Sequence, residues 1–184
     1  MKPIYIAEDV YLRELEIADA PDMFNLINSQ RNYLGRWLPF VENTRDENDS
    51  RSFIQSVINA PTDRKEHIFA IISEGTFAGI IGFKGTDHDN KKTEIGYWLG
   101  EDFQGRGIMT LAVEALCHMA FNSMGMNRIQ ILCAVGNTRS SNIPRRLGFV
   151  FEGVEREGEL LTSGKFTDVE VFSILKREFE HTDM

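Results

Sequence analysis

Apolar residues recur along the chain at two different spacings, which predict strands in some segments and helices in others. Short runs rich in β-branched and aromatic residues predict strands at residues 12–17, 67–73, 77–84, 93–99, 128–135, 150–161 and 166–175. Apolar positions three and four residues apart predict helices at residues 19–27 and, most clearly, at residues 108–120. Strands therefore outnumber helices.

A capping signal predicts one further helix near the start of the chain. Thr44 and Glu47 form a T-x-x-E capping box ahead of an apolar pattern, so we expect a helix over about residues 45–60 that Pro61 ends. The apolar, aromatic segment before it, residues 33–40, either covers the core or lines a pocket.

The order of these elements predicts a fold class. Hairpin-connected strands flank a central strand–helix–strand unit at residues 93–135, which favours a mixed α/β (α+β) domain over a doubly wound one. Residues 1–184 fit one domain, and a 42% hydrophobic content supports a buried core.

Composition and charge exclude several kinds of partner. The chain has 20 Lys and Arg against 28 Asp and Glu, a net charge of −8, which argues against nucleic acid and anionic membranes. No apolar run approaches the roughly 20 residues of a membrane helix, so we expect a cytoplasmic chain. Cys117 and Cys133 are expected to be buried free thiols, and the scattered histidines predict no metal site.

A glycine-rich turn before the clearest helix is the main chemical signal. Gln104-Gly105-Arg106-Gly107 connects a strand to this helix, an arrangement that directs free backbone N–H groups and a helix dipole at one point suited to a phosphate. The alternative is a helix that merely starts after such a turn. A P-loop would need Lys after Gly107, and a dinucleotide fingerprint would need a small residue at Thr110.

This stretch resembles the pyrophosphate loop of the GNAT superfamily of acyl-CoA N-acyltransferases, [RQ]-x-x-G-x-[GA], except that Met109 replaces the final small residue. Within the superfamily the chain is similar to the RimJ/RimL subgroup of ribosomal-protein N-terminal acetyltransferases. The blocks that carry this resemblance are residues 94–99, 105–110, 137–142 and 146–149.

The resemblance implies that acetyl-CoA binds where two parallel strands, residues 93–99 and 128–135, splay apart from a mostly antiparallel sheet. It also implies direct attack of an amine on the thioester, with a peptide N–H near residues 97–99 stabilising the oxyanion. The cofactor-binding residues that it implies are Tyr97, Trp98, Leu99, Gln104, Gly105, Arg106, Gly107, Ile108, Met109, Thr110, Asn137 and Arg146. Arg139, Arg145 and Arg146 either pair with the phosphates or form a solvated basic face.

Two glutamates are candidates for the base that the resemblance requires. Glu159 stands where RimL-like enzymes carry a proposed catalytic glutamate, and its alternative is a surface glutamate within the acidic run 155–159. Glu94 is a second candidate because it lies on a gap-forming strand, where a structural role is the alternative.

Ser140 is the candidate acid for the departing thiolate. Many GNAT enzymes carry a Tyr where this chain has Pro144, and Ser140 is the replacement that the N-x-x-S block suggests. Its alternative is capping of a helix N-terminus. If that helix starts at Asn137, Pro144 should kink it, whereas a cap at Ser141 or Asn142 would place the proline in the first turn.

The resemblance thus implies an acetyl-CoA-dependent N-acetyltransferase that acts on the N-terminal α-amine of a protein, such as a ribosomal protein. Two alternatives stay open: a small amine acceptor (a polyamine, an amino acid or an antibiotic), and a silent acyl-CoA-binding module on the same fold. A homodimer is a further expectation, since relatives often dimerise.

Overall fold

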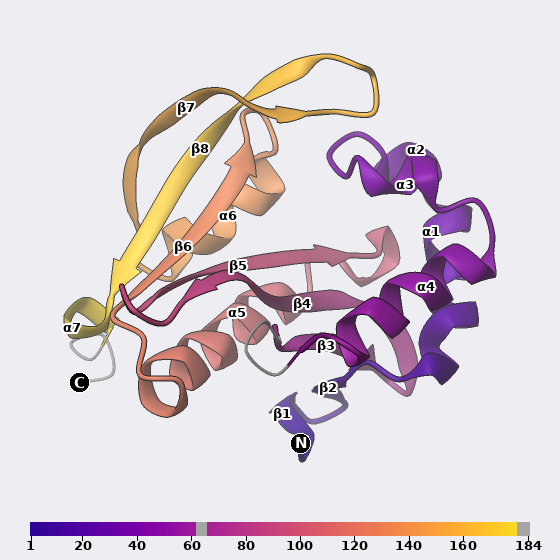
Figure 1. Ribbon diagram of the computed structural model, residues 1–184, viewed down its shortest axis with the longest axis horizontal. Helices are drawn as coiled ribbons and strands as arrows, with labels where there is room; N and C mark the ends of the chain where they lie inside the picture. The colour runs from indigo at the N-terminus through magenta and orange to yellow at the C-terminus, as the bar shows by residue number, and fades with distance from the viewer. Residues whose placement is uncertain (62–65, 180–184) are drawn as a thin grey trace.

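One sheet of eight strands forms the centre of the molecule (Figure 1). The computed structural model describes residues 1–61 and 66–179. The strands are β1 (Ile4–Ala7), β2 (Val10–Glu14), β3 (Ile68–Ser73), β4 (Thr76–Asp87), β5 (Lys92–Leu99), β6 (Arg128–Ala134), β7 (Val150–Leu160) and β8 (Phe166–Leu175). The helices are α1 (Ala20–Ser29), α2 (Arg31–Leu34), α3 (Phe40–Asn43), α4 (Glu47–Ile58), α5 (Ile108–His118), α6 (Thr138–Arg146) and α7 (Lys176–Phe179), with shorter helical turns η1 (Ile17–Asp19), η3 (Glu101–Phe103) and η4 (Met119–Ser123). No helix in these described ranges is long and apolar enough to cross a membrane.

The strand order is β1-β2-β3-β4-β5-β6-β8-β7, and every neighbouring pair is antiparallel except β5 and β6. A parallel pair needs a crossover connection, which α5 supplies here between β5 and β6. The mixed α/β fold class is therefore confirmed, and the strand–helix–strand unit stands at its centre.

The core has two halves because successive side chains of a strand point to opposite faces of the sheet. On β5, Ile95 and Leu99 join the apolar cluster beneath α5, whereas Trp98 joins the cluster beneath α1 and α4. The sheet is thus covered by helices on both faces (Figure 1).

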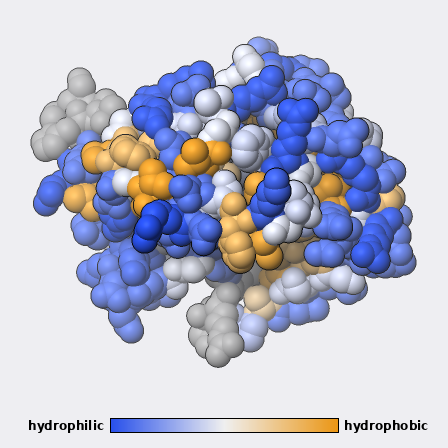
Figure 2. All heavy atoms as spheres, turned by 90° about the horizontal axis from the view of Figure 1, so that it is seen from above, coloured by the Kyte–Doolittle hydropathy of each residue, from blue (hydrophilic) through white to orange (hydrophobic). Residues whose placement is uncertain are grey.

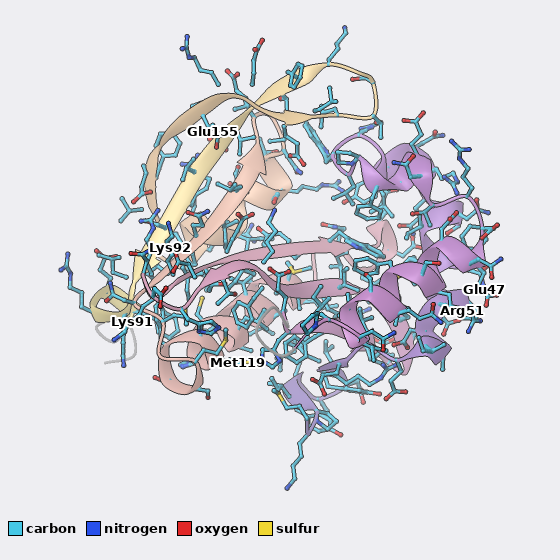
Figure 3. All side chains as sticks on the ribbon, viewed as in Figure 1. Glu47, Arg51, Lys91, Lys92, Met119 and Glu155 are labelled. Carbon is cyan, nitrogen blue, oxygen red and sulfur yellow. The ribbon has the colours of Figure 1, made fainter. Side chains whose placement is uncertain are left out.

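The start of α4 differs from the capping box predicted at Thr44 and Glu47. The Thr44 hydroxyl donates to the Phe40 carbonyl at the end of α3, so Thr44 belongs to the preceding turn. Asp46 caps α4 instead, and Asp49 completes the capping box. Inside the helix Glu47 and Arg51 form an ion pair of 2.5 Å, visible on its outer side in Figure 3.

Strand β7 is one edge of the sheet and is exposed along most of its length. Its apolar residues Val150, Phe151 and Val154 are 53%, 46% and 48% exposed. Figure 2, which views the molecule from the side of β7 and β8, shows hydrophobic side chains gathered within a mostly hydrophilic surface.

An ion pair between β6 and β7 is expected to make stability depend on acid pH. Arg128 donates to both carboxylate oxygens of Glu152 at 2.7 and 2.6 Å, and the Ser173 hydroxyl donates to the same carboxylate at 2.8 Å. The hydrogen bonds from Arg128 are the main cause that lowers the pKa of Glu152 from 4.5 to about 2.

A carboxylate with a lowered pKa stabilises the folded state above its unfolded pKa and loses that contribution as the pH falls through the folded value. We expect the wild-type protein to lose more stability than Glu152→Gln between pH 4.5 and about pH 2. The difference should be about 1 kcal/mol or less because the pair is partly exposed. Urea midpoints at a series of pH values measure it, and parallel curves for the two proteins would contradict it.

Candidate active site

The parallel strands β5 and β6 pair only at their beginnings. Their register runs from Lys92 beside Arg128 to Glu94 beside Gln130, although both strands continue well beyond these residues. Past Glu94 the facing edges of the two strands therefore separate, and their N–H and C=O groups are available to a bound chain of amides. Figure 1 shows β6 and β8 diverging from β5.

The loop before α5 presents free backbone amides. Gly105 and Gly107 have φ values of +74° and +76°, and Gly107 caps α5 without any side-chain hydrogen bond. A cavity of about 400 Å³ lies at this helix end, with Arg139 and Asn142 of α6 on its far wall. Predicted cofactor residues that line it are Leu99, Gln104, Gly105, Gly107, Ile108, Met109, Thr110 and Arg146. The unpartnered amides and the two arginines suit a diphosphate.

The structure separates the arginines into two groups. Arg139 and Arg146 line the cavity at the head of α5. Arg106 instead forms an ion pair with Glu74, so its side chain does not line this cavity. Arg145 pairs with Glu170 at 2.8 Å on the surface, as expected if it belongs to a solvated basic face and does not pair with the phosphates.

A second cavity, of about 440 Å³, lies between the open strands and the N-terminal helices. Its polar side chains are those of Lys84, Glu94, Tyr97, Asn137, Ser140 and Glu159, together with the Cys133 thiol. Trp37 and Phe40 line it, so the segment 33–40, which was expected either to cover the core or to line a pocket, contributes to a pocket. The Thr162 hydroxyl donates to the Gly35 carbonyl at 2.7 Å, joining the β7–β8 hairpin to the α2–α3 connection.

A smaller cavity, of about 80 Å³, lies between these two. That space shares Leu99, Gln104 and Arg139 with the cavity at the head of α5, and shares Trp98 and Ser140 with the second cavity. Three adjoining cavities therefore extend from the helix head past Ser140 to Glu159, and all the predicted cofactor and catalytic residues except Arg106 line one or more of them.

Glu159 is partly buried at the cavity wall. The register of β7 against β8 shifts between Glu155 and Glu159, and Glu157 within that bulge has φ +54°. Four residues of β7 here span two residues of β8, so the strand bulges immediately before Glu159. Burial is the main cause that raises the pKa of Glu159, the positive charge of Lys84 lowers it, and Glu94 raises it.

Glu94 already has partners. One of its oxygens lies 2.6 Å from Lys84 Nζ, and the other accepts from Gln130 Nε2 at 3.3 Å. This engagement corresponds to the structural alternative for Glu94, which leaves Glu159 as the carboxylate with the greater freedom to take a proton.

Ser140 lies in the first turn of α6 beside two other groups that carry a proton. Its Oγ is 3.3 Å from both the Tyr97 hydroxyl and Cys133 Sγ. Burial raises the pKa of Cys133 to about 11 and raises the pKa of Tyr97 further above its ordinary value. All three groups therefore hold their protons near neutral pH.

The start of α6 resolves the alternatives for Ser140 and Pro144. The Asn137 side chain accepts from Ser140 N at 3.3 Å and caps the helix, so a cap at Ser141 or Asn142 is wrong and the Ser140 hydroxyl does not cap. Pro144 lies inside the helix and cannot donate to the Ser140 carbonyl. The Tyr97 hydroxyl donates to this carbonyl at 3.1 Å instead.

Sequence reasoning missed the Tyr97 hydroxyl and Lys84. Tyr97 was predicted to lie at the cofactor through its backbone, yet its hydroxyl reaches Ser140, 43 residues away in the chain. Pro144 was the available signal, because a proline inside a helix leaves the carbonyl four residues earlier in need of a donor.

Within residues 1–61 and 66–179, no group of three or more His, Cys, Asp or Glu could hold a metal.

Comparisons with known proteins extend the likeness over almost the whole chain. Residues 9–150 match the family model described as acetyltransferase (GNAT) domain. YdaF of Bacillus subtilis (strain 168), described as "Putative ribosomal N-acetyltransferase", is 35% identical over 181 residues, which cover 95% of this chain and 96% of that protein.

Solved structures agree with this likeness. RimL, a ribosomal L7/L12 alpha-N-protein acetyltransferase in complex with coenzyme A, matches with a TM-score of 0.89 at 26% identity, covering 95% of this chain and 98% of that chain. MccE, the microcin C7 self immunity acetyltransferase in complex with acetyl-CoA and AMP, matches with a TM-score of 0.87 at 31% identity, covering 94% of this chain and 95% of that chain.

Proposed function

The chain belongs to the GNAT acetyltransferase family, so it is an acetyl-CoA-dependent N-acetyltransferase, and we propose that its acceptor is the N-terminal α-amine of a ribosomal protein. The observation that carries the proposal is the row of adjoining cavities from the amides of α5 to Ser140 and Glu159. The names of YdaF and RimL support the choice of acceptor.

Bound acetyl-CoA supplies an acetyl thioester, and the chain's own residues hold it at both ends. The amides at Gly105 and Gly107, with Arg139 and Arg146, bind the diphosphate, and the open edges of β5 and β6 bind the amide-rich arm. A backbone N–H near the end of β5 stabilises the oxyanion that forms when the amine attacks. Alignment of the two reactants lowers the barrier without a covalent enzyme intermediate.

Deprotonation of the amine falls to Glu159. An α-amine has a pKa of about 8 and a lysine amine about 10.4, so an N-terminus is already partly neutral near pH 7 and needs only a modest base. Burial raises the pKa of Glu159 and makes it a stronger base than an ordinary glutamate. Ser140, at the other side of the path, donates to the departing thiolate.

Lys84 is expected to set the acid limb of the pH–rate profile. Its positive charge lowers the pKa of Glu159, so Lys84→Met removes that influence and should raise this pKa. Because Glu159 acts as a base only when deprotonated, the acid limb of kcat/KM should move to higher pH. A pH series of kcat/KM measures the shift, and an acid limb that stays in place or moves to lower pH would contradict it.

A small-molecule amine is the second candidate acceptor. The cavity of about 440 Å³ that Glu159 lines is the proposed acceptor cavity. Its aromatic side chains, Trp37, Phe40 and Trp98, suit a planar group. MccE, whose structure holds AMP beside acetyl-CoA, supports this candidate at 31% identity.

Thiol release from acetyl-CoA across a panel of acceptors tests the proposal. The panel contains N-terminal peptides of ribosomal proteins, the same peptides with acetylated N-termini and an internal lysine, spermidine, and an AMP derivative that carries a free amine. We expect turnover with the free N-termini alone. Turnover with the small amines alone would favour the second candidate, and acetyl-CoA binding without turnover would favour a silent acyl-CoA-binding module.

The proposal takes residues 1–184 as one acetyltransferase domain, because β7 and β8, which follow the matched segment, belong to the same sheet. A ribosomal-protein acceptor would also place the enzyme in the cytoplasm. The homodimer expected from the family stays a prediction, which sedimentation of the purified chain can test.

A further inference from the structure

One carbonyl inside α6 is left without its helical donor. Pro144 has no amide hydrogen, so the carbonyl of Ser140, four residues earlier, cannot receive the usual i→i−4 hydrogen bond. The Tyr97 hydroxyl, from β5 on the other side of the gap, donates to this carbonyl at 3.1 Å. A strand residue thus replaces the missing bond of the helix.

The same tyrosine also contacts the Ser140 hydroxyl. Because the Tyr97 proton is directed at the carbonyl, the lone pairs of its oxygen are free to accept from Ser140 Oγ, which lies 3.3 Å away. Ser140 is therefore fixed at two points by one side chain, through its backbone and through its hydroxyl. Tyr97 is well suited to this because its ring packs against the core cluster beneath α5.

We propose that Tyr97 is the positioning residue that holds the Ser140 hydroxyl in the cavity for proton donation. This inference rests on the proposed function, in which Ser140 serves the departing thiolate. In that step the C–S bond breaks with its electron pair on sulfur, the Ser140 hydroxyl turns its proton from the Tyr97 oxygen to the sulfur and donates it there, and water returns a proton to Oγ. Glu159 releases the proton of the amine to solvent, so the proton that water gives to Ser140 Oγ is replaced and no proton is gained or lost overall.

A double-mutant cycle tests whether the effect of the Tyr97 hydroxyl on kcat depends on the Ser140 hydroxyl. Ser140→Ala is expected to lower kcat about 100-fold, the low end of the effect of a positioned acid. Tyr97→Phe should lower kcat about 10-fold with little change in KM for acetyl-CoA, since it leaves an acid that is poorly oriented. The double variant should be no slower than Ser140→Ala, because an absent hydroxyl cannot be mispositioned.

Pro144→Ala separates positioning from simple satisfaction of the carbonyl. In the Tyr97→Phe background it restores an amide donor to the Ser140 carbonyl but no acceptor for the hydroxyl. We expect it to recover part of the lost thermal stability and none of the lost kcat. Tyr11→Phe, on β2 three strands away from β5, is the matched loss of a phenolic hydroxyl and should retain wild-type kcat.

Each contrary result has a distinct meaning. A wild-type enzyme that turns over no amine would overturn the proposed function together with this inference. Unchanged kcat in Ser140→Ala would remove Ser140 from the mechanism and Tyr97 with it. If Ser140→Ala is slow, three results would overturn the positioning role alone: wild-type kcat in Tyr97→Phe, losses that multiply in the double variant, or recovery of kcat by Pro144→Ala.

Discussion

Gly107→Val is expected to weaken acetyl-CoA binding about 100-fold, equivalent to about 3 kcal/mol. Gly107 caps α5 with φ +76°, a conformation that a β-branched residue adopts only with strain of about 1–3 kcal/mol. No neighbouring atom lies within 4 Å of the position that a Cβ would take, so the effect comes from the backbone and not from a clash. A turn that relaxes this strain no longer directs its amides at the diphosphate. Calorimetric titration with coenzyme A measures the loss.

Gly125→Val is the matched control for this variant. Gly125 follows η4 with φ +69° and likewise has no atom within 4 Å of a Cβ, but it lies beyond the other end of α5. It should lose stability as Gly107→Val does, seen as a lower Tm, and keep its affinity for coenzyme A. Equal loss of affinity in both variants would show that general destabilisation, and not the backbone amides at Gly105 and Gly107, explains the weaker binding of coenzyme A.

Glu159→Gln is expected to lower kcat about 100-fold near pH 7, since a positioned general base contributes about 10²- to 10⁴-fold. The loss should shrink above about pH 8, where an α-amine becomes neutral without help. Acetyl-CoA affinity should stay unchanged, because Glu159 lines the acceptor cavity and not the cavity at the head of α5. Steady-state thiol release at a series of pH values measures the effect.

Glu155→Gln is the matched control on the same strand. Glu155, labelled on β7 in Figure 3, is exposed and does not line the acceptor cavity. We expect it to retain wild-type kcat across the pH range. If Glu159→Gln behaves in the same way, the base must be another group, and a loss that is constant with pH would point to a role other than deprotonation.

Much of the central unit could be predicted because its signals are local. The apolar spacing of residues 108–120 requires only neighbours three and four apart, and it gave α5 almost to the residue. The two glycines at 105 and 107 require positive φ within a single turn, which the structure has. The class of the fold followed from the order of such elements.

Other predictions failed where a competing partner decides between local options. Thr44 fits a capping box in sequence, but its hydroxyl is used by the Phe40 carbonyl, and Asp46 takes the cap. Arg106 stands in the phosphate loop, but the side chain of Glu74, 32 residues earlier, pairs with it. The first outcome depends on α3, a short helix that the apolar pattern does not predict, and the second depends on the tertiary structure that brings Glu74 near.

The sequence by itself determined the strand, the glycine turn and the helix of the proposed diphosphate-binding site, because spacing and backbone conformation there depend on adjacent residues. Only the tertiary structure decided which side chains meet at the acceptor cavity. Glu159 follows a bulge in β7, opposite Thr167 of β8, and meets Lys84 of β4 and Glu94 of β5 only at the wall of this cavity. Tyr97 meets Ser140 only because β5 and β6 part after Glu94 and α6 packs beside the gap, a contact that depends on strand register and helix position together.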